Sequence, residues 1–279
     1  MSLILKKRFL NICFIYSFAI CILISIGSIL FAKNPLSTLN ERANKSLFCF
    51  ILTSKNNFDN KTRAVHRTWA TKCDNYKFIS VIPDHIRRQS QLISSNQVNY
   101  NGMHILQPPG LVKDHYDMLT DKVFLTIKHL HKEYGDYDWY LKADDDTFIF
   151  VDNLRTFVLD KDKSLPVTYG YDFKVIVDHG YHSGGGGYLL SNEALNRLGA
   201  MLAQNYKNCS NSGTEDVDVA RCLRQVGVYP NKSLDNGRER FHPLDLMAHF
   251  NNVYPDWMKK YATNQILPVI KRFFLVILI

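Results

Sequence analysis

Length, composition and charge limit the classes to which this protein can belong. The chain has 279 residues, of which 46% are hydrophobic and only 14 are Gly and 9 are Pro, so a disordered, collagen-like or low-complexity protein is excluded. An α/β fold of roughly 250 residues often forms a single unit, so one domain or two tightly joined domains are expected. The net charge of +8 comes from Lys and Arg residues scattered among carboxylates, and we therefore expect no nucleic-acid partner.

The amino-terminal segment has the pattern of a membrane anchor. Three basic residues at 6–8 precede an uncharged run over 9–32, and about 20 apolar residues suffice to span a bilayer as a helix. A cleaved signal peptide is the alternative, but its apolar region usually has about 7–15 residues, and no small-x-small cleavage site follows. By the positive-inside rule we expect a type II protein with a cytosolic tail over 1–8, one transmembrane helix over 9–32 and a short stem over 33–46 before a lumenal body.

The cysteines of the body agree with an oxidising compartment. Cys49, Cys73, Cys209 and Cys222 form an even set, as in proteins that carry disulfides. No C-x-x-C pair occurs, so a zinc site is not indicated. Nearness along the chain favours Cys49–Cys73 and Cys209–Cys222 among the three connectivities.

Four sequons also suit a protein of the secretory pathway. Each predicts a glycosylation site in a surface loop, and the four are Asn44, Asn60, Asn208 and Asn231. Asn208 directly precedes Cys209, so a disulfide there can block its modification.

Strand and helix patterns alternate along the body. Short apolar runs over 47–53, 76–82 and 137–142 predict strands, and the first is continuous, as in a strand covered on both faces. Helices are expected over 61–72 and 114–134, the second with one buried stripe that includes Tyr116, Val123, Ile127 and Tyr134. This rhythm predicts a mostly parallel twisted sheet with helices on both faces.

An acidic triplet follows the third expected strand. Ligands of open α/β sheets bind outside the carboxyl ends of strands, which is where Asp144, Asp145 and Asp146 lie. In an extended segment Asp144 and Asp146 face one side, and Asp145 faces away. Carboxylates in this arrangement suit Mg²⁺ or Mn²⁺ bridged to substrate phosphates. A solvated acidic turn is the alternative, and an EF-hand is excluded by the missing Gly and closing Glu.

Two further segments carry candidate chemistry. Gly184–Gly187 lie between aromatic and aliphatic residues, which favours an ordered loop that approaches a ligand closely over a flexible linker. Glu215 and Asp216 lead into an expected helix over 218–226. A carboxylate at a helix start can act as a general base or can simply complement the helix dipole.

These segments together resemble a known family. The stretches over 49–54, 63–73, 138–149, 183–191 and 215–217, with Phe241-His242-Pro243, are similar in order and residues to the core 1 β1,3-galactosyltransferases. That family consists of Fringe-related inverting β1,3-glycosyltransferases of family 31 with a GT-A nucleotide-sugar-binding fold. The resemblance implies a GT-A catalytic domain over 47–250. It also implies a single-pass type II Golgi enzyme that transfers galactose from UDP-galactose to the 3-hydroxyl of GalNAc-α-Ser/Thr.

The resemblance also implies roles for individual residues. Asp146 is expected to bind Mn²⁺ or Mg²⁺ directly, and Asp144 to lie nearer the ribose or a metal-bound water. Asp216 is the expected general base, with Glu215 second. The expected nucleotide-sugar-binding residues are Thr53, Arg63, Lys142, Asp144, Asp145, Gly185 and Gly186.

The carboxyl-terminal part departs from the family. Its later Ser-Phe-His segment, whose histidine is a third metal ligand, has no match in the divergent segment over 251–279. His242 and His249 lie near enough to be considered instead, although a structural role is the commoner one for such histidines. The terminal apolar run over 273–279 is too short to span a bilayer and reads either as a buried strand or as the product of an incomplete gene model.

Two other functions stay open at this point. A non-catalytic, chaperone-like relative has no need of the acidic triplet, which favours the enzyme. The sequence does not distinguish the proposed enzyme from a Fringe-type β1,3-glycosyltransferase with another donor or acceptor. Donor choice depends on differences of a few kcal/mol in the free energy with which the pocket binds each sugar. The expected partners are a UDP-sugar, a GalNAc-bearing glycoprotein and the membrane, with a homodimer also open.

Overall fold

The structure is a computed structural model that describes residues 45–174, 176–245, 248, 251, 253–256, 258 and 276–278. The chain divides into two compact units, 1–44 and 45–279, and the fold below is that of the second. The expected anchor over 9–32, the sequon at Asn44 and His249 lie outside the described residues. Within the described ranges, no helix has both the length and the apolar character needed to cross a membrane.

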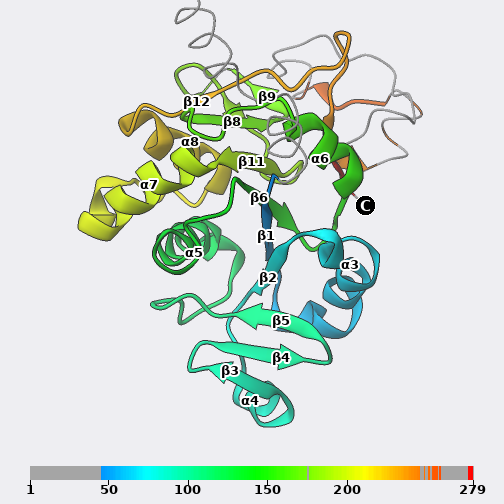
Figure 1. The fold of residues 1–279 in the computed structure, drawn as a ribbon, viewed down its shortest axis with the longest axis vertical. Helices are drawn as coiled ribbons and strands as arrows, with labels where there is room; N and C mark the ends of the chain where they lie inside the picture. Colours follow the sequence, from blue (N-terminus) through cyan, green and yellow to red (C-terminus); the bar gives the residue numbers. More distant parts are fainter. Residues whose placement is uncertain are drawn as a thin grey trace, which may run out of the picture. The chain divides into compact units, whose positions relative to one another are not determined.

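A nine-stranded sheet forms the centre of the body, in the order β12-β8-β11-β6-β1-β2-β5-β4-β3 (Figure 1). Its middle strands run parallel: β6 (Trp139–Asp144), β1 (Leu47–Leu52), β2 (Asn75–Ile79) and β5 (Met103–Leu106). The flanking strands are β11 (Tyr188–Ser191), β8 (Val167–Gly170), β12 (Tyr229–Pro230), β4 (Gln97–Tyr100) and β3 (Gln91–Ser94). The three strands expected from apolar runs are thus confirmed as β1, β2 and β6.

The expectation of a mostly parallel sheet is only partly right. β11 is antiparallel to both β6 and β8, and β3, β4 and β5 form an antiparallel meander. In the turn between β4 and β5, Asn101 and Gly102 have φ angles of 51° and 86°, as a two-residue hairpin turn requires. The Asn-Gly pair is a strong hairpin signal that predicts an antiparallel pair at this edge.

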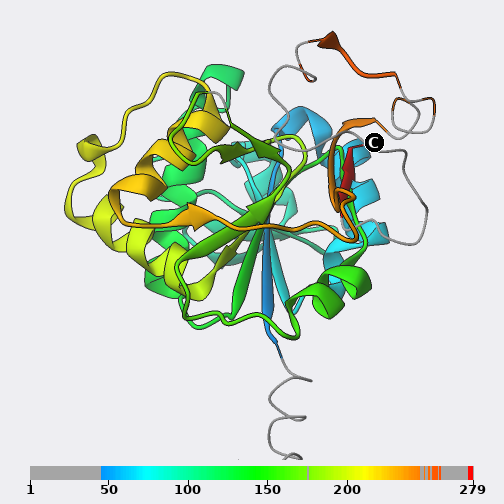
Figure 2. The same cartoon turned by 90° about the horizontal axis from the view of Figure 1, so that it is seen from above.

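Helices cover both faces of the sheet, as expected (Figure 2). One face packs against α5 (Leu119–Glu133), α7 (Asn192–Gln204) and α8 (Glu215–Gln225), and the other against α3 (Arg63–Thr68) and α6 (Val151–Val158). Every residue of β1 is buried, which explains why its sequence is apolar throughout instead of alternating. Phe48 and Phe50 lie in the core under α5, and Cys49 and Ile51 lie in the opposite core.

The two expected helices are shorter than their patterns indicated. A π-helical turn (Phe58–Thr62) and a 3₁₀ turn (Ala70–Lys72) flank α3, and a 3₁₀ turn (Tyr116–Met118) precedes α5. Val123 and Ile127 are fully buried as expected, but Tyr116 is 85% exposed. Its inclusion in the buried stripe was wrong, because the tighter turn does not share the period of the α-helix that follows.

Short elements complete the fold: α4 (Asp84–Gln89), β9 (Asp172–Phe173), β10 (Tyr181–His182), β7 (Thr147–Ile149), β13 (Phe241–Asp245) and β14 (Val276–Leu278). β14 lies between β13 and β7 in a separate small sheet. The terminal apolar run therefore contributes a strand.

Both expected disulfides are present. Cys49 on β1 bonds to Cys73, just before β2, with a Cα–Cα distance of 6.2 Å. Cys209 bonds to Cys222 on α8, with a Cα–Cα distance of 5.4 Å. The first bridge fastens α3 to the central strands, and the second holds the loop that leads into α8.

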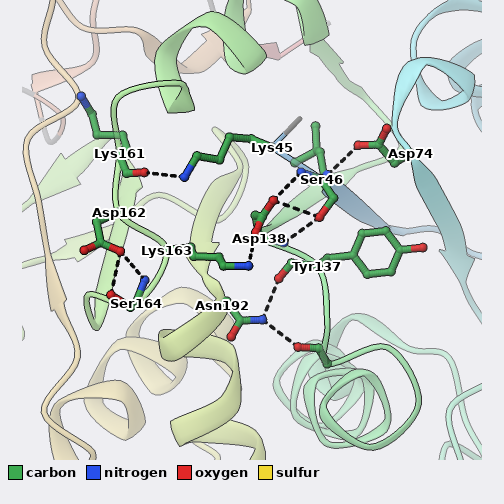
Figure 3. A network of polar contacts seen from close by, with 12 residues as sticks. Lys45, Ser46, Asp74, Tyr137, Asp138, Lys161, Asp162, Lys163, Ser164 and Asn192 are labelled. Carbon is green, nitrogen blue, oxygen red and sulfur yellow. Dashed lines mark hydrogen bonds and ion pairs between the residues drawn. The ribbon is translucent and has the colours of Figure 1, made fainter. Parts of the chain in front are cut away.

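A polar network fastens the amino ends of β1 and β6 (Figure 3). The Asp138 carboxylate accepts a hydrogen bond of 2.7 Å from the backbone N–H of Ser46 and pairs with Lys163. In return, the Ser46 hydroxyl accepts a hydrogen bond of 3.0 Å from the Asp138 N–H. The acidic triplet lies at the other end of the same two strands.

Candidate active site

A cleft lies at the carboxyl ends of β1 and β6. The last residue of β1, Leu52, is in register with Asp144, the last residue of β6. The cleft has a volume of about 460 Å³, and its lining includes the triplet together with Thr53, Asn57, Lys61, Asp114, His115, Tyr116 and Lys122. The parallel register thus brings residues more than ninety positions apart to one edge of the sheet.

The three carboxylates of the triplet have different partners. Asp145 is 8% exposed and accepts hydrogen bonds of 2.6 Å from Thr53 and 2.8 Å from Asn57. Burial raises the pKa of Asp145, although these hydrogen bonds oppose the shift. Asp144 pairs with Lys142 at 2.9 Å, and Asp146 pairs with Lys61 at 3.0 Å.

The backbone at the triplet differs from the extended chain assumed for it. Asp144 ends β6, and Asp145 and Asp146 form the turn that leads into β7. The alternation of an extended strand therefore stops at Asp144, and the turn sets the directions of the last two carboxylates. Asp145 and Asp146 both bond to side chains of the segment that follows β1, and all three carboxylates line the same cleft.

The triplet fits a divalent cation that takes part of its coordination from substrate. Among the described residues, no group of three or more His, Cys, Asp or Glu side chains is arranged to hold a metal. Mg²⁺ is usually held by one or two carboxylates, with waters and substrate phosphates filling the other positions. Asp144 and Asp146 border the cleft and supply carboxylates of that kind. Asp144 and Asp146 are now paired with Lys142 and Lys61, and a bound cation would take the place of these ammonium groups as their partner.

A buried lysine joins the triplet to the start of α8. Lys142 is 1% exposed, and its ammonium group donates to the Gly184 carbonyl at 3.1 Å. It also pairs with Asp144 and lies 3.4 Å from a Glu215 oxygen. Burial lowers the pKa of Lys142, but the carboxylates of Asp144 and Glu215 outweigh burial and hold it above its usual value.

The two acidic residues that begin α8 occupy different environments. Glu215 is 9% exposed, and its second oxygen accepts a hydrogen bond of 2.6 Å from the Tyr188 hydroxyl. Burial raises the pKa of Glu215, and Lys142 opposes this shift. Asp216 is less buried and accepts a hydrogen bond of 3.1 Å from the Gly184 N–H. Asp216 is therefore the more accessible of the two carboxylates.

The glycine loop passes between the triplet and α8. A Cβ on Gly184 would lie 2.7 Å from a Glu215 carboxylate oxygen, and one on Gly186 would lie 3.4 Å from Pro243. The Gly185 carbonyl accepts a hydrogen bond of 3.2 Å from Thr147. The close approach to Glu215 thus favours glycine at position 184, whereas a Cβ at position 186 would make an ordinary contact with Pro243. The hydrogen bonds and contacts on both sides make the loop an ordered wall of the site.

A second buried lysine forms part of the cleft and was missed from the sequence. Lys122 on α5 pairs with Asp114 at 2.6 Å and donates to the Thr53 carbonyl. Ser80 donates a hydrogen bond of 2.7 Å to the other Asp114 oxygen. The periodicity of α5 predicts that position 122 is inward but says nothing of a carboxylate partner on the preceding loop.

The remaining expected residues lie apart from this centre. Arg63 pairs with Asp59 on the neighbouring π-helical turn, and Arg63 is not among the residues that line the cleft. His242 is buried on β13, 5% exposed. The sequon residues Asn60, Asn208 and Asn231 are all exposed.

The chain is similar in sequence to several curated transferases and synthases of sugar chains. No protein-family model matches it. It is 29% identical over 244 residues to glycoprotein-N-acetylgalactosamine 3-beta-galactosyltransferase 1 of Xenopus laevis, covering 83% of this chain and 61% of that protein. It is 28% identical over 208 residues to human chondroitin sulfate synthase 3, covering 67% of this chain and 21% of that protein. The chain is thus similar to β1,3-glycosyltransferases.

The resemblance inferred from the sequence motifs is thus confirmed. A mouse beta-1,3-glucosyltransferase is also similar, with 31% identity over 128 residues, 44% of this chain and 25% of that protein. The chain spans less than two thirds of the length of each of these relatives. Among solved structures, a galactosyltransferase in complex with donor and acceptor sugar analogues matches with a TM-score of 0.44 and 13% identity, over 82% of this chain and 85% of that one.

Proposed function

We propose that this protein is an inverting, metal-dependent glycosyltransferase that transfers galactose from UDP-galactose to the 3-hydroxyl of GalNAc-α-Ser/Thr. The observation that carries the proposal is the connection of two carboxylate groups through Lys142. One group, at the end of β6, borders a cleft, and the other begins α8. A metal-dependent inverting transfer needs carboxylates that hold a cation beside the diphosphate and a carboxylate base near the acceptor hydroxyl, and this arrangement would supply both.

The cleft is assigned to the nucleotide sugar. Asp144 and Asp146 would hold Mn²⁺ or Mg²⁺, which supplies positive charge to the departing diphosphate. Lys61, now paired with Asp146, would contact the same phosphates. Thr53 and Asp145 would border the nucleoside, and Gly185 and Gly186 the transferred sugar. Arg63 keeps its assignment to the donor through the family resemblance alone.

Asp216 is assigned as the general base. It would accept the proton of the acceptor hydroxyl as that oxygen attacks the anomeric carbon. The new carbon–oxygen bond forms on the face opposite the breaking bond to the UDP oxygen, so an α-linked donor gives a β-linked product. Tyr188 and Lys142 hold Glu215, which leaves Asp216 to take the proton.

The cellular setting is also part of the proposal. A lumenal Golgi enzyme with a type II anchor accords with the uncharged run over 9–32, the two disulfides and the name of the Xenopus relative. The acceptor is then a GalNAc-bearing glycoprotein.

The test is transfer by the full chain, purified in detergent, to a GalNAc-α-Thr peptide. UDP-galactose, UDP-glucose and UDP-N-acetylglucosamine are offered separately, each with Mn²⁺ and with a chelator, and the product linkage is read by NMR. Galactose transfer that needs Mn²⁺ and yields a β1,3 linkage supports the proposal. Transfer of another sugar would favour the Fringe-type alternative, and absence of transfer with every donor would favour a chaperone-like relative.

A further inference from the structure

A second and larger cavity lies along the carboxyl-terminal half of α5, beside the β3–β4 hairpin. Its volume is about 680 Å³, and none of its lining residues belongs to the cleft at the triplet. Figure 1 shows α5 next to the edge of the sheet that carries β3 and β4. The lining residues are Ser94, Ser95, Asn96, Gln97, Pro109, Leu125, Lys128, His129, Lys132, Glu133 and Tyr134.

The wall of this cavity carries an excess of basic groups. Lys128 and Lys132 come from adjacent turns of α5, against one carboxylate among the lining residues, Glu133. Glu133 lies 3.1 Å from Lys132, but both side chains are largely exposed, where an ion pair contributes little. The surface offered to a ligand is therefore positive.

Lys77 adds a buried cation behind this wall. Among the described residues three lysines are deeply buried, and two of them have carboxylate partners: Lys142 with Asp144 and Lys122 with Asp114. Lys77 is 6% exposed, and its ammonium group faces the Tyr134 ring at 5.7 Å. Burial alone lowers the pKa of Lys77, with no carboxylate to oppose the shift. A buried cation without a partner is costly, and an anion in the neighbouring cavity would provide one.

His129 has a polar atom without a partner at the same place. Its Nε2 atom is buried and makes no hydrogen bond to any described residue. Its ring lies edge-on to Tyr134. Burial lowers the pKa of His129, Glu133 opposes this shift, and Lys132 and Lys77 add to it. Two independent groups near Tyr134 therefore lack the partners that buried polar groups normally have.

We propose that this cavity binds an acidic sugar, with its sulfate or carboxylate group next to Lys128 and Lys132, which line the cavity, and with the buried Lys77 ammonium group over the Tyr134 ring adding to the attraction. An isolated oxyanion would fill only a small part of a space of this size. The Ser94, Ser95 and Asn96 side chains border the remainder and offer hydrogen bonds to sugar hydroxyls. The Tyr134 ring provides a flat apolar surface. This site is separate from the donor cleft, and ligand binding there does not depend on the transfer reaction.

Glucose 6-sulfate, glucose and inorganic sulfate are the probes for this site. Binding to the full chain in detergent is measured by calorimetry and by the ligand-dependent rise in melting temperature. We expect glucose 6-sulfate to bind, glucose not to bind, and sulfate alone to bind more weakly. Equal binding of sulfate and glucose 6-sulfate would overturn the sugar part of the proposal, and absence of binding by both would overturn all of it.

Variants locate the site. Lys77→Met and the exposed pair Lys128→Gln/Lys132→Gln should each weaken glucose 6-sulfate binding about tenfold or more, while Lys207→Met, an exposed lysine elsewhere, should not. Lys77→Met should also raise the melting temperature without ligand, since it removes an unpaired buried charge. Loss of binding in Lys61→Met instead would place the ligand in the donor cleft and overturn the proposal.

Discussion

The Lys142 ammonium group lies 3.4 Å from a carboxylate oxygen of Glu215, and both side chains are almost completely buried. Lys142 comes from β6 and Glu215 from the start of α8, so this ion pair joins the central sheet to the helix that carries the proposed base. The Tyr188 hydroxyl completes the arrangement on the other Glu215 oxygen. The pair thereby fixes the position of Asp216, the next residue along the helix.

Replacing Lys142 should therefore destabilise the fold. Lys142→Met leaves the Glu215 and Asp144 carboxylates without their buried partner, and breaking such a pair costs about 3–5 kcal/mol. Urea unfolding followed by circular dichroism measures the loss. In the double variant Lys142→Met/Glu215→Gln the loss should be smaller, because the neutral amide no longer needs a cation. Equal losses in the single and double variants would show that the pair is not coupled.

Asp216→Asn should abolish most turnover without preventing donor binding. General base catalysis contributes about 10²–10⁴-fold to rate, and the amide keeps the size of the side chain. Steady-state transfer assays give kcat, and calorimetry with UDP gives donor affinity. Asp152→Asn on the exposed surface of α6 is the matched control. An Asp216→Asn enzyme with unchanged kcat would move the base to another residue.

Loss of the Cys49–Cys73 bridge should lower stability. In the chain-entropy account a disulfide typically stabilises by about 2–4 kcal/mol, so Cys49→Ala/Cys73→Ala should lower the free energy of unfolding by that amount. Chemical denaturation of both proteins measures it. Peptide mapping of the wild-type chain without reduction should recover these two cysteines in one linked peptide, and finding either in a different bridge would contradict the pairing.

Acid should weaken the fold partly through Asp138. Burial raises the pKa of its carboxyl group, but hydrogen bonds from Lys163 and Ser46 outweigh burial and hold the pKa below its usual value. The unfolded chain, with an aspartate pKa of about 3.9, then binds the proton more readily than the folded chain. The stabilisation is full above that pH and is lost as pH falls through the folded pKa.

Urea unfolding between pH 6 and pH 2, at about one-unit steps, tests this linkage. Asp138→Asn should be less stable at neutral pH and should lose less stability than the wild type on acidification. Asp152→Asn should follow the wild-type curve. An acid dependence of Asp138→Asn as steep as that of the wild type would assign the effect to other carboxylates.

Local patterns in the sequence determined the central strands, the helices on both faces and the disulfides. The apolar run over 47–53 predicts a strand buried on both faces, and in the structure β1 is such a strand. The triplet directly follows the apolar run over 137–142, which is why it could be expected at the carboxyl edge of the sheet. The Asn101-Gly102 signal for the antiparallel edge was also available in the sequence.

Tertiary structure alone decided which charged groups meet. The partners of Lys142 and Lys122 come from different segments, and Lys77 has none among the described carboxylates. Periodicity predicts whether a side chain points inward, but a buried charge is tolerated only when packing brings its partner to it. Two further predictions failed because a turn interrupts the regular period of the sequence. Asp145 lies in the turn after β6, and Tyr116 lies in the 3₁₀ turn before α5. The sequence therefore determined where the acidic triplet lies, and the packing of β6, α5 and α8 determined how the neighbouring charges are paired.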